Sequence, residues 1–384
     1  MPKSIVLATT VDVSLGLLKG YPSFLVAQGW DVHVVSSGGE RLAALGELDG
    51  VTVHAIPMRR APSPFADAAA LLAWVRLLRK LSPDAVSLGT PKASLLGLVA
   101  ARMRRVPVRQ YILRGLRLHT TRGLLRRILW LSERAAIAMS TDVVAVSRSL
   151  RDEAVDLGLD RRGRMSVVGE GSSNGIDLEQ FDAGRFTTAE TEQRAASLAL
   201  RPGVPTIGFV GRLTRDKGID TLLKAVERVQ VATPVDLLLI GGFDDEEAES
   251  WIDGARSRGV HVTVVDHVAD PAPYIAMFDV ACIPSLREGF CNAAAEASAM
   301  GVPVVGTRVT GMVDPILDGE TGLLSAPGDD RALAAHLSAL LTDPERAADL
   351  GRAGAVFIRD NYERSSVQSR YEARLAASTT GTDS

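Results

Sequence analysis

Cysteine is scarce in this chain of 384 residues, which contains only Cys282 and Cys291. Two cysteines cannot supply a disulfide framework, and such low usage is typical of proteins kept in a reducing cytosol. The two residues also lack accompanying histidines, which argues against a metal site built on them.

Long apolar runs are missing as well. No stretch approaches the roughly 20 residues that a membrane-spanning helix needs, and residues 1–5 lead into a strand without a signal-peptide pattern. Hydrophobic residues nevertheless make up 46% of the chain, and the mean hydropathy is +0.12. We therefore expect a cytoplasmic protein with well-filled cores, and the length suggests two domains.

The net charge is only −3, but it is unevenly distributed. Residues 1–185 contain 25 Lys and Arg against 17 Asp and Glu, a net of +8, and the remainder has a net of −11. The segment 102–127 holds nine arginines and no acidic residue. This asymmetry predicts an anionic partner for the first half of the chain.

Apolar residues are interleaved with the last of these arginines, at residues 124–130. This part of the Arg102–Arg127 region suits an anionic membrane surface, on which a lipid-linked acceptor would lie. The alternative is a solvated basic face of a helix. Nucleic acid is not a favoured partner, because aromatic residues are only 5% of the chain and no stacking platform or reader motif is present.

Strand-like and helix-like segments alternate through the first half of the chain. Short apolar runs, typical of buried parallel strands, are separated by segments with helical periodicity. Such alternation predicts a parallel sheet with helices on both faces. The predicted strands are residues 5–8, 31–36, 51–56, 85–88, 108–112, 142–146 and 164–168, and the predicted helices are residues 15–28, 65–81, 93–103, 124–139 and 148–156.

The second half repeats this alternation after an irregular segment at residues 169–205. We therefore expect an α/β protein of two doubly wound, Rossmann-like domains facing across a cleft. The expected parts are residues 1–185, residues 186–360, and residues 361–384 as a helix that crosses back to the first domain, with a polar tail. The predicted strands are residues 206–210, 236–240, 260–265, 279–283 and 303–306, and the predicted helices are residues 216–229, 246–257, 292–300, 329–341, 344–358 and 361–377.

The most informative stretch is residues 284–296, where a strand end, a tight loop and a helix start follow one another. Glu288 lies in the loop, and Glu296 lies one to two turns into the helix, about 12 Å away at helical rise. The helix start between them offers free N–H groups to an anion. The stretch is therefore suited to a diphosphate flanked by two hydroxylated groups. Alternatively, it is an ordinary junction with two solvated glutamates.

A second motif, residues 209–218, places two cations at another junction. Gly211 ends a strand, and Arg212 and Lys217 flank the start of the next helix. Arginine forks onto phosphate oxygens, and lysine adds a point charge. A diphosphate leaving group needs such neutralisation as the glycosidic bond breaks. The alternative is a basic helix start with surface charges, although cations there oppose the helix dipole.

Together the two motifs resemble retaining glycosyltransferases of the GT-B fold, glycosyltransferase family 4. The resemblance is carried by residues 211–218 and by Glu288-x7-Glu296, with further landmarks at residues 174–177 and 318–324, and it covers nearly the whole chain. It implies transfer from a nucleoside-diphosphate sugar with retained anomeric configuration and without a metal or a cofactor.

The resemblance also implies a role for each motif residue. Arg212 and Lys217 would bind the donor diphosphate, Glu296 the ribose hydroxyls and Glu288 the hydroxyls of the sugar. The implied catalytic residues are Glu288, Arg212, Lys217 and Arg114, and the implied donor-binding residues are Gly16, Gly211, Arg212, Lys217, Glu288, Gly289, Phe290, Cys291, Asn292 and Glu296.

Arg114 stands where many members of that family carry a histidine that reaches the donor sugar. The surrounding residues 109–123 resemble the branch that builds capsular polysaccharide, exopolysaccharide and O-antigen. His119 is the alternative for the histidine's place. If Arg114 faces the sugar, its fixed charge suits a carboxylate or a phosphate. Alternatively, Arg114 anchors its loop or binds an acceptor phosphate.

The predicted function is that of a hexosyltransferase in cell-surface polysaccharide synthesis. The donor would be a UDP-sugar, the acceptor a glycan or polyprenyl-linked saccharide, and the location the cytoplasm or the inner face of the cell membrane. Two alternatives stay open: a UDP-sugar epimerase or hydrolase of the same layout, and a catalytically silent sugar-nucleotide-binding subunit. A dinucleotide-dependent dehydrogenase is disfavoured, because no Gly-x-Gly-x-x-Gly follows the first strand of either domain.

Overall fold

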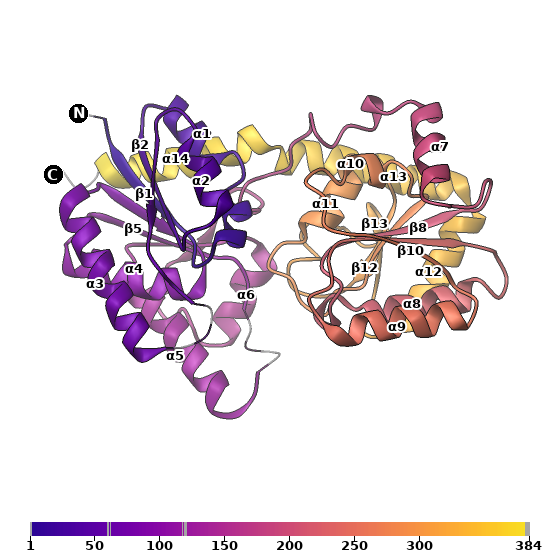
Figure 1. Cartoon of the computed structure of the whole chain (residues 1–384), viewed down its shortest axis with the longest axis horizontal. Helices are drawn as coiled ribbons and strands as arrows, with labels where there is room; N and C mark the ends of the chain where they lie inside the picture. The colour runs from indigo at the N-terminus through magenta and orange to yellow at the C-terminus, as the bar shows by residue number, and fades with distance from the viewer. Residues whose placement is uncertain (1, 60, 62, 117, 119–120, 381–384) are drawn as a thin grey trace. The chain divides into compact units, whose positions relative to one another are not determined.

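The computed structural model describes residues 2–59, 61, 63–116, 118 and 121–380. These residues form two compact units, which Figure 1 shows in one view. Unit 1 consists of Met1–Gly175 with Ser365–Ser384, and unit 2 consists of Ile176–Arg364. The division falls earlier in the chain than the predicted boundary after residue 185, so residues 176–185 belong to unit 2.

Unit 1 is built on a seven-stranded sheet in which all the strand pairs are parallel. The order is β3-β2-β1-β4-β5-β6-β7. Its central strands are apolar runs buried on both faces, as a sheet covered by helices requires; Ile5, Val6 and Leu7 of β1 expose at most 1% of their surface. The strands are β1 (Ser4–Ala8), β2 (Asp31–Ser36), β3 (Val51–Ala55), β4 (Ala85–Leu88), β5 (Val108–Leu113), β6 (Asp142–Ala145) and β7 (Met165–Val167).

The helices of unit 1 connect these strands, with one exception at the end of the chain. The helix predicted over residues 15–28 is interrupted, because Gly20 adopts a left-handed conformation with φ of 75° and separates a 3₁₀ turn from α1. The short helix α2 was not predicted. The helical elements are η1 (Asp12–Leu18), α1 (Tyr21–Ala27), α2 (Glu40–Gly46), α3 (Pro64–Leu81), α4 (Pro91–Met103), α5 (Gly123–Met139), α6 (Arg148–Asp156) and α14 (Arg364–Thr380).

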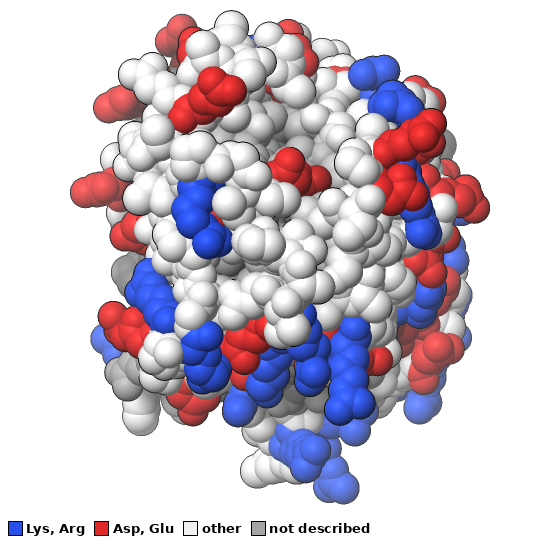
Figure 2. Space-filling model, turned by 90° about the vertical axis from the view of Figure 1, so that its right-hand side faces the viewer, with Lys and Arg blue, Asp and Glu red and all other residues white. Residues whose placement is uncertain are grey.

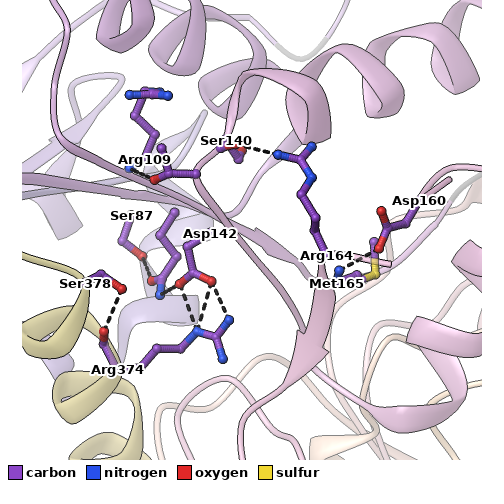
Figure 3. A network of polar contacts seen from close by, with 11 residues as sticks. Ser87, Arg109, Ser140, Asp142, Asp160, Arg164, Met165, Arg374 and Ser378 are labelled. Atoms are coloured by element: carbon purple, nitrogen blue, oxygen red, sulfur yellow. Dashed lines mark hydrogen bonds and ion pairs between the residues drawn. The ribbon is translucent and has the colours of Figure 1, made fainter. Parts of the chain in front are cut away.

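Helix α14 is the last helix of the chain, and its residues from Ser365 onward belong to unit 1. Figure 3 shows the polar network that joins it to the sheet. Arg374 donates from Nε to Asp142 Oδ2 at 2.9 Å, and Gln110 donates to the same carboxylate at 2.9 Å. Ser87 in turn donates to Gln110 Oε1 at 2.7 Å. The network therefore links α14 to three neighbouring strands of unit 1.

Unit 2 has a six-stranded parallel sheet of order β10-β9-β8-β11-β12-β13. The last of these strands, β13, was not predicted, although its residues overlap the landmark at 318–324. The apolar strands β9 and β11 are buried along their whole length. The strands are β8 (Thr206–Val210), β9 (Asp236–Ile240), β10 (His261–Val265), β11 (Val280–Ile283), β12 (Val304–Thr307) and β13 (Gly322–Ser325).

The helices of unit 2 cover both faces of this sheet. Figure 2 shows the surface of the molecule on the side of α7 and α12, where basic and acidic side chains are interspersed in the lower half and the centre is largely uncharged. The helical elements are η2 (Ala183–Arg185), α7 (Thr188–Ser197), η3 (Arg215–Lys217), α8 (Ile219–Val229), α9 (Glu246–Ser257), α10 (Ala272–Ile275), α11 (Asn292–Ala299), α12 (Asp330–Thr342) and α13 (Pro344–Tyr362).

Candidate functional site

The strand order of unit 2 reverses between β8 and β11, which lie side by side at the centre of the sheet. The connections after two such strands run to opposite sides and leave a crevice at their carboxyl ends, where open α/β sheets bind ligands. The loop after β8 carries Arg212 and Lys217, and the loop after β11 carries Glu288. The topology therefore brings the two sequence motifs to one place.

These two loops are pressed together by their backbones. A Cβ atom at Gly218 would lie 2.0 Å from the carbonyl oxygen of Pro284, and Gly218 has φ of 75°. The backbone N–H of Leu286 donates to the carbonyl of Asp216 at 2.9 Å. Only glycine fits this position, because a side chain would both strain the backbone and collide with the facing loop.

Lys217 and Glu288 form the closest ion pair between the motifs. Lys217 Nζ lies 2.5 Å from Glu288 Oε1, and the two side chains expose 21% and 11% of their surface. Burial by itself would lower the pKa of Lys217, but the neighbouring groups, Glu288 foremost and Asp216 among them, together outweigh burial and raise the pKa above its usual value. Lys217 is therefore a fixed cation at neutral pH, partly shielded from water.

Asp216 organises the remaining cations of the site. Arg287 Nη2 donates to it at 2.7 Å, and Arg212 Nη2 lies 3.9 Å from the same oxygen. Burial favours a raised pKa for Asp216, but the Thr214 hydroxyl, Arg287, Arg212 and Lys217 together lower it. The Asp216 carboxylate therefore stays ionised and holds the two arginines near Lys217. Together these three cations form a preorganised lining.

Arg212 is the more exposed of the two predicted phosphate ligands, at 54% of its side-chain surface, and its Nη1 donates to Asp244 at 3.1 Å. Two aspartates precede α9 and act differently: Asp245 caps the helix by accepting from the N–H of Glu247, whereas Asp244 pairs with Arg212. A surface ion pair of this kind is weak, so Arg212 remains available to an anion.

The start of α11 supplies the third part of the site. Cys291 is its N-cap residue, and no side chain caps the helix. The loop is held by the N–H of Cys291, which donates to Gly311 at 2.8 Å, and by the Phe290 ring, whose centroid lies 5.0 Å from that of Tyr362. Burial raises the pKa of the Cys291 thiol, so this cysteine is a neutral packing residue rather than a nucleophile.

The other predicted residues of this segment occupy three different environments. Asn292 is exposed at the first position of α11, Gly289 is partly exposed in the loop, and Glu296 is partly exposed beyond the first turn of the helix. Gly211 follows β8 with φ of 153°, close to the Gly241 backbone: a Cβ atom at Gly241 would lie 2.0 Å from the Gly211 carbonyl oxygen. The predicted donor-binding residues of unit 2 therefore lie in the loops after β8 and β11 and in the first part of α11.

Gly16 and Arg114 belong to unit 1. Gly16 is exposed in η1, directly after β1, where a Cβ atom would make only an ordinary contact of 3.7 Å with Arg41. Packing within unit 1 does not require a glycine there. Arg114 follows β5, and its Nε lies so close to Gly89 that a Cβ atom there would be only 2.4 Å away. His119 lies outside the described residues.

Sequence reasoning assigned no role to Asp216 or Arg287, although both lie inside the quoted motifs. Asp216 and Arg287 belong to the site because their two loops, 71 residues apart in sequence, meet in the fold. A local sequence pattern cannot predict such a contact. Arg287 had one available signal, which is its place next to Glu288 in the loop after a buried strand.

Other features of unit 2 do not compete with this site. A pocket of about 410 Å³ lies under α7, lined in part by Phe278, Met300 and Val302. These residues precede β11 and β12 or follow α11, so the pocket is at the amino ends of the strands, whereas Lys217 is at their carboxyl ends.

Within the described residues there is no group of three or more His, Cys, Asp or Glu side chains placed to hold a metal ion, and no helix is long and apolar enough to span a membrane.

Comparisons with known proteins bear on both units. Residues 204–343 match the family described as "Glycosyl transferases group 1", and residues 23–171 match the family described as "Glycosyl transferase 4-like domain". The capsular polysaccharide biosynthesis glycosyltransferase CapM of Staphylococcus aureus is 35% identical over 355 residues, which cover 92% of this chain and 91% of that protein.

Solved structures match over nearly the full length. A glycosyltransferase from Rickettsia africae has a TM-score of 0.82 at 16% identity and covers 98% of both chains. HepE of Anabaena, crystallised with UDP-glucose, has a TM-score of 0.80 at 17% identity over 97% of this chain and 99% of that one. At these identities the likeness shows the fold, which is the GT-B fold of two Rossmann-like domains. Since both halves match and a relative of 35% identity spans nearly the whole length, the chain belongs to the group 1 glycosyl transferases.

Proposed function

We propose that this glycosyltransferase moves a hexose from a UDP-sugar to a glycan or polyprenyl-linked saccharide in cell-surface polysaccharide synthesis, with retention of anomeric configuration. The observation that carries the proposal is the Lys217–Glu288 pair at the switch point of the unit 2 sheet. It sets a shielded cation beside a carboxylate next to the uncapped start of α11.

Each group of this arrangement matches one part of a sugar nucleotide. Lys217 and Arg212 bind the diphosphate, which the N–H groups at the start of α11 also favour. Glu288 accepts hydrogen bonds from the sugar hydroxyls, Glu296 accepts them from the ribose, and Gly289–Asn292 contact sugar and phosphate through the backbone. The resemblance to the family adds Gly16 of unit 1 to the proposed donor-binding residues.

In the transfer step, negative charge develops on the leaving diphosphate, which Lys217 and Arg212 are proposed to bind. An acceptor oxygen attacks the anomeric carbon as the bond from that carbon to the diphosphate oxygen breaks. The acceptor proton passes to the departing phosphate on the same face, and UDP leaves. Negative charge grows on the diphosphate in the transition state, so Lys217 and Arg212 stabilise that state more than they stabilise the bound donor.

The choice of donor and of acceptor draws on the relatives. HepE of Anabaena, which shares the fold, was crystallised with UDP-glucose, and this supports a UDP-sugar as the donor. The name of the Staphylococcus aureus relative places it in capsular polysaccharide biosynthesis, and this supports a saccharide acceptor of the cell surface.

A panel of nucleotides tests the donor proposal. Thermal unfolding is followed with UDP, GDP, ADP and their common sugar conjugates for the wild type, Lys217→Ala and Lys224→Ala. Lys224 is a matched control on α8, because it is an exposed lysine of the same unit that pairs with Asp220, one turn earlier on the same helix. UDP and a UDP-sugar are expected to stabilise the wild type and Lys224→Ala, by about 2.7 kcal/mol at 100 times the dissociation constant, and to have little effect on Lys217→Ala.

Two results would contradict the proposal. Equal stabilisation of Lys217→Ala and the wild type would remove Lys217 from the donor site, and stabilisation by another nucleotide alone would replace UDP. Consumption of a UDP-sugar without any acceptor would instead favour the hydrolase or epimerase, and binding without any turnover would favour a silent subunit.

We also propose that α5 holds unit 1 on an anionic membrane. Four apolar residues of this helix, Leu124, Leu125, Ile128 and Leu131, expose between 46% and 73% of their surface. Arg126 and Arg127 lie among them, which gives the paired apolar and cationic character of interfacial helices. A polyprenyl-linked acceptor would be presented on that surface.

A further inference from the structure

Arg114 is partly exposed as a residue, but it carries part of its guanidinium into the interior of unit 1. Its Nε and Nη1 atoms each expose less than 1 Å², and neither has a hydrogen-bond partner among the described residues. A buried donor without a partner is costly, and an unpaired buried charge more so. Two of the three guanidinium nitrogens are therefore left without an acceptor from the described residues.

The fold makes room for this guanidinium at a particular point of the sheet. Gly89 directly follows β4, and a Cβ atom there would lie 2.4 Å from Arg114 Nε. The strand order of unit 1 reverses between β1 and β4, and β5 is the other neighbour of β4. Arg114 thus lies over the carboxyl end of a switch-point strand, where open α/β sheets bind ligands.

A second buried donor belongs to Tyr21, whose ring centroid lies 6.4 Å from that of Tyr371, and both tyrosines interact electrostatically with Arg114. The hydroxyl of Tyr21, on α1 after the other switch-point strand, is shut off from solvent and has no hydrogen-bond partner among the described residues. Tyr371 also interacts electrostatically with the guanidinium, but its hydroxyl already donates to Ser172 at 3.0 Å. Burial lowers the pKa of Arg114 to about 10, so the side chain is still a cation at neutral pH.

The cations of the unit 2 site differ from Arg114 in having carboxylate partners. There, Lys217 and Arg212 are paired with Glu288 and with Asp244, whereas no carboxylate among the described residues forms an ion pair with Arg114. We propose that Arg114, together with the Tyr21 hydroxyl, forms an oxyanion subsite in unit 1 that takes a phosphate or carboxylate group of a substrate. The assignment to a substrate rests on the proposed function, but binding of an oxyanion does not.

Inorganic phosphate is the probe for the subsite. Thermal unfolding is measured against phosphate concentration at constant ionic strength for the wild type, Arg114→Met, Gly89→Ala and Arg104→Met. Gly89→Ala displaces the guanidinium without changing any charge, and Arg104 is an exposed arginine at the end of α4. Saturable stabilisation is expected for the wild type and Arg104→Met, with an apparent dissociation constant at least tenfold weaker in the other two variants.

Two outcomes would overturn the subsite. An equal phosphate response in Arg114→Met, whatever its loss of thermal stability, would mean an adventitious ion only and would make Arg114 a structural anchor. No response in the wild type would mean that the subsite binds no oxyanion. Stabilisation of Arg114→Met by UDP checks that unit 2 is folded, and Lys217→Ala is expected to keep the phosphate response, which separates this subsite from the donor site.

Two pairs of ligands distinguish the source of the oxyanion. A sugar carboxylate would make UDP-glucuronate bind at least tenfold more tightly than UDP-glucose in the wild type but not in Arg114→Met. An acceptor phosphate would make farnesyl phosphate bind more tightly than farnesol, again only with Arg114 present. If neither preference depends on Arg114, the assignment to a substrate is wrong.

Discussion

Lys217 and Glu288 are the residues on which the proposed chemistry depends most. Each side chain is held by the other at 2.5 Å, so removing either one changes the charge at the switch point of the unit 2 sheet. Lys217→Ala and Glu288→Gln are each expected to lower the rate of sugar transfer by at least about 10²-fold, comparable to the loss of one preorganised contact. The measurement is kcat/KM with a defined donor and acceptor.

The control for this experiment is Lys224→Ala, which removes an exposed lysine from the same unit. Its rate is expected to stay near that of the wild type. Near-normal transfer by Lys217→Ala or by Glu288→Gln would show that the pair has a structural role and that the donor diphosphate is held elsewhere.

Glu133 is a second residue with a charge that depends on its surroundings. Burial raises its pKa from 4.5 to about 7, against the opposing effect of the hydrogen bond from Tyr111. Between pH 4.5 and 7 the unfolded chain has released this proton while the folded chain still holds it. The free energy of unfolding therefore falls as pH rises through this window, by up to about 1.4 kcal/mol per pH unit.

Replacing Glu133 by Gln removes this titration and keeps the size of the side chain. Urea unfolding at pH 5, 6 and 7 is expected to show a steeper loss of stability for the wild type than for Glu133→Gln. Parallel pH dependences of the two proteins would mean that the folded and unfolded states titrate Glu133 alike.

Helix α5 is the element that exposes an apolar face, and we proposed above that an anionic membrane covers this face. Leu124 and Leu131 expose 73% and 60% of their surface, which is unusual for two leucines of one amphipathic stripe. The double variant Leu124→Ser with Leu131→Ser is expected to bind at least tenfold more weakly to vesicles containing an anionic phospholipid. Flotation of the protein with such vesicles, at low and high salt, measures this.

Val231→Ser is the matched control for α5, because Val231 is 87% exposed but belongs to unit 2. Its binding to vesicles is expected to equal that of the wild type. If the α5 variant floats as well as the control, the apolar stripe has another occupant, and the membrane proposal is wrong.

At the scale of the whole molecule, α14 attaches the C-terminal part of the chain to unit 1, the rest of which comes from the N-terminal part. Arg374 Nε lies 2.9 Å from Asp142 Oδ2, and the two side chains expose 32% and 9% of their surface. Arg374→Met leaves the Asp142 carboxylate without its cation. The expected loss in free energy of unfolding is about 2–3 kcal/mol, somewhat below that of a fully buried pair.

The comparison for this variant is Arg352→Met, which breaks the exposed pair of Arg352 with Asp349 and is expected to change stability by less than about 1 kcal/mol. Urea-unfolding curves of the three proteins measure both effects. A stability of Arg374→Met close to that of Arg352→Met would show that apolar packing alone holds α14.

Much of the secondary structure follows from short-range patterns. Buried parallel strands such as β8 and β9 are largely apolar runs, and their predicted bounds agree with the structure because strands buried on both faces have this pattern. The predicted helix over residues 216–229 begins later, at Ile219, because Gly218 must adopt a left-handed conformation against Pro284. Sequence alone does not contain the position of that facing loop.

By itself, the sequence determined the alternation of strands and helices, hence two parallel α/β sheets, and the residues of the two motifs near their switch point. Local chemistry was enough for these features, since apolar periodicity, glycine and charge act over a few residues. Tertiary structure decided which charges are paired. Lys217 meets Glu288, and Arg287 meets Asp216, whereas Nε and Nη1 of Arg114 are buried with no partner among the described residues, because pairing depends on which loops the sheet order brings together.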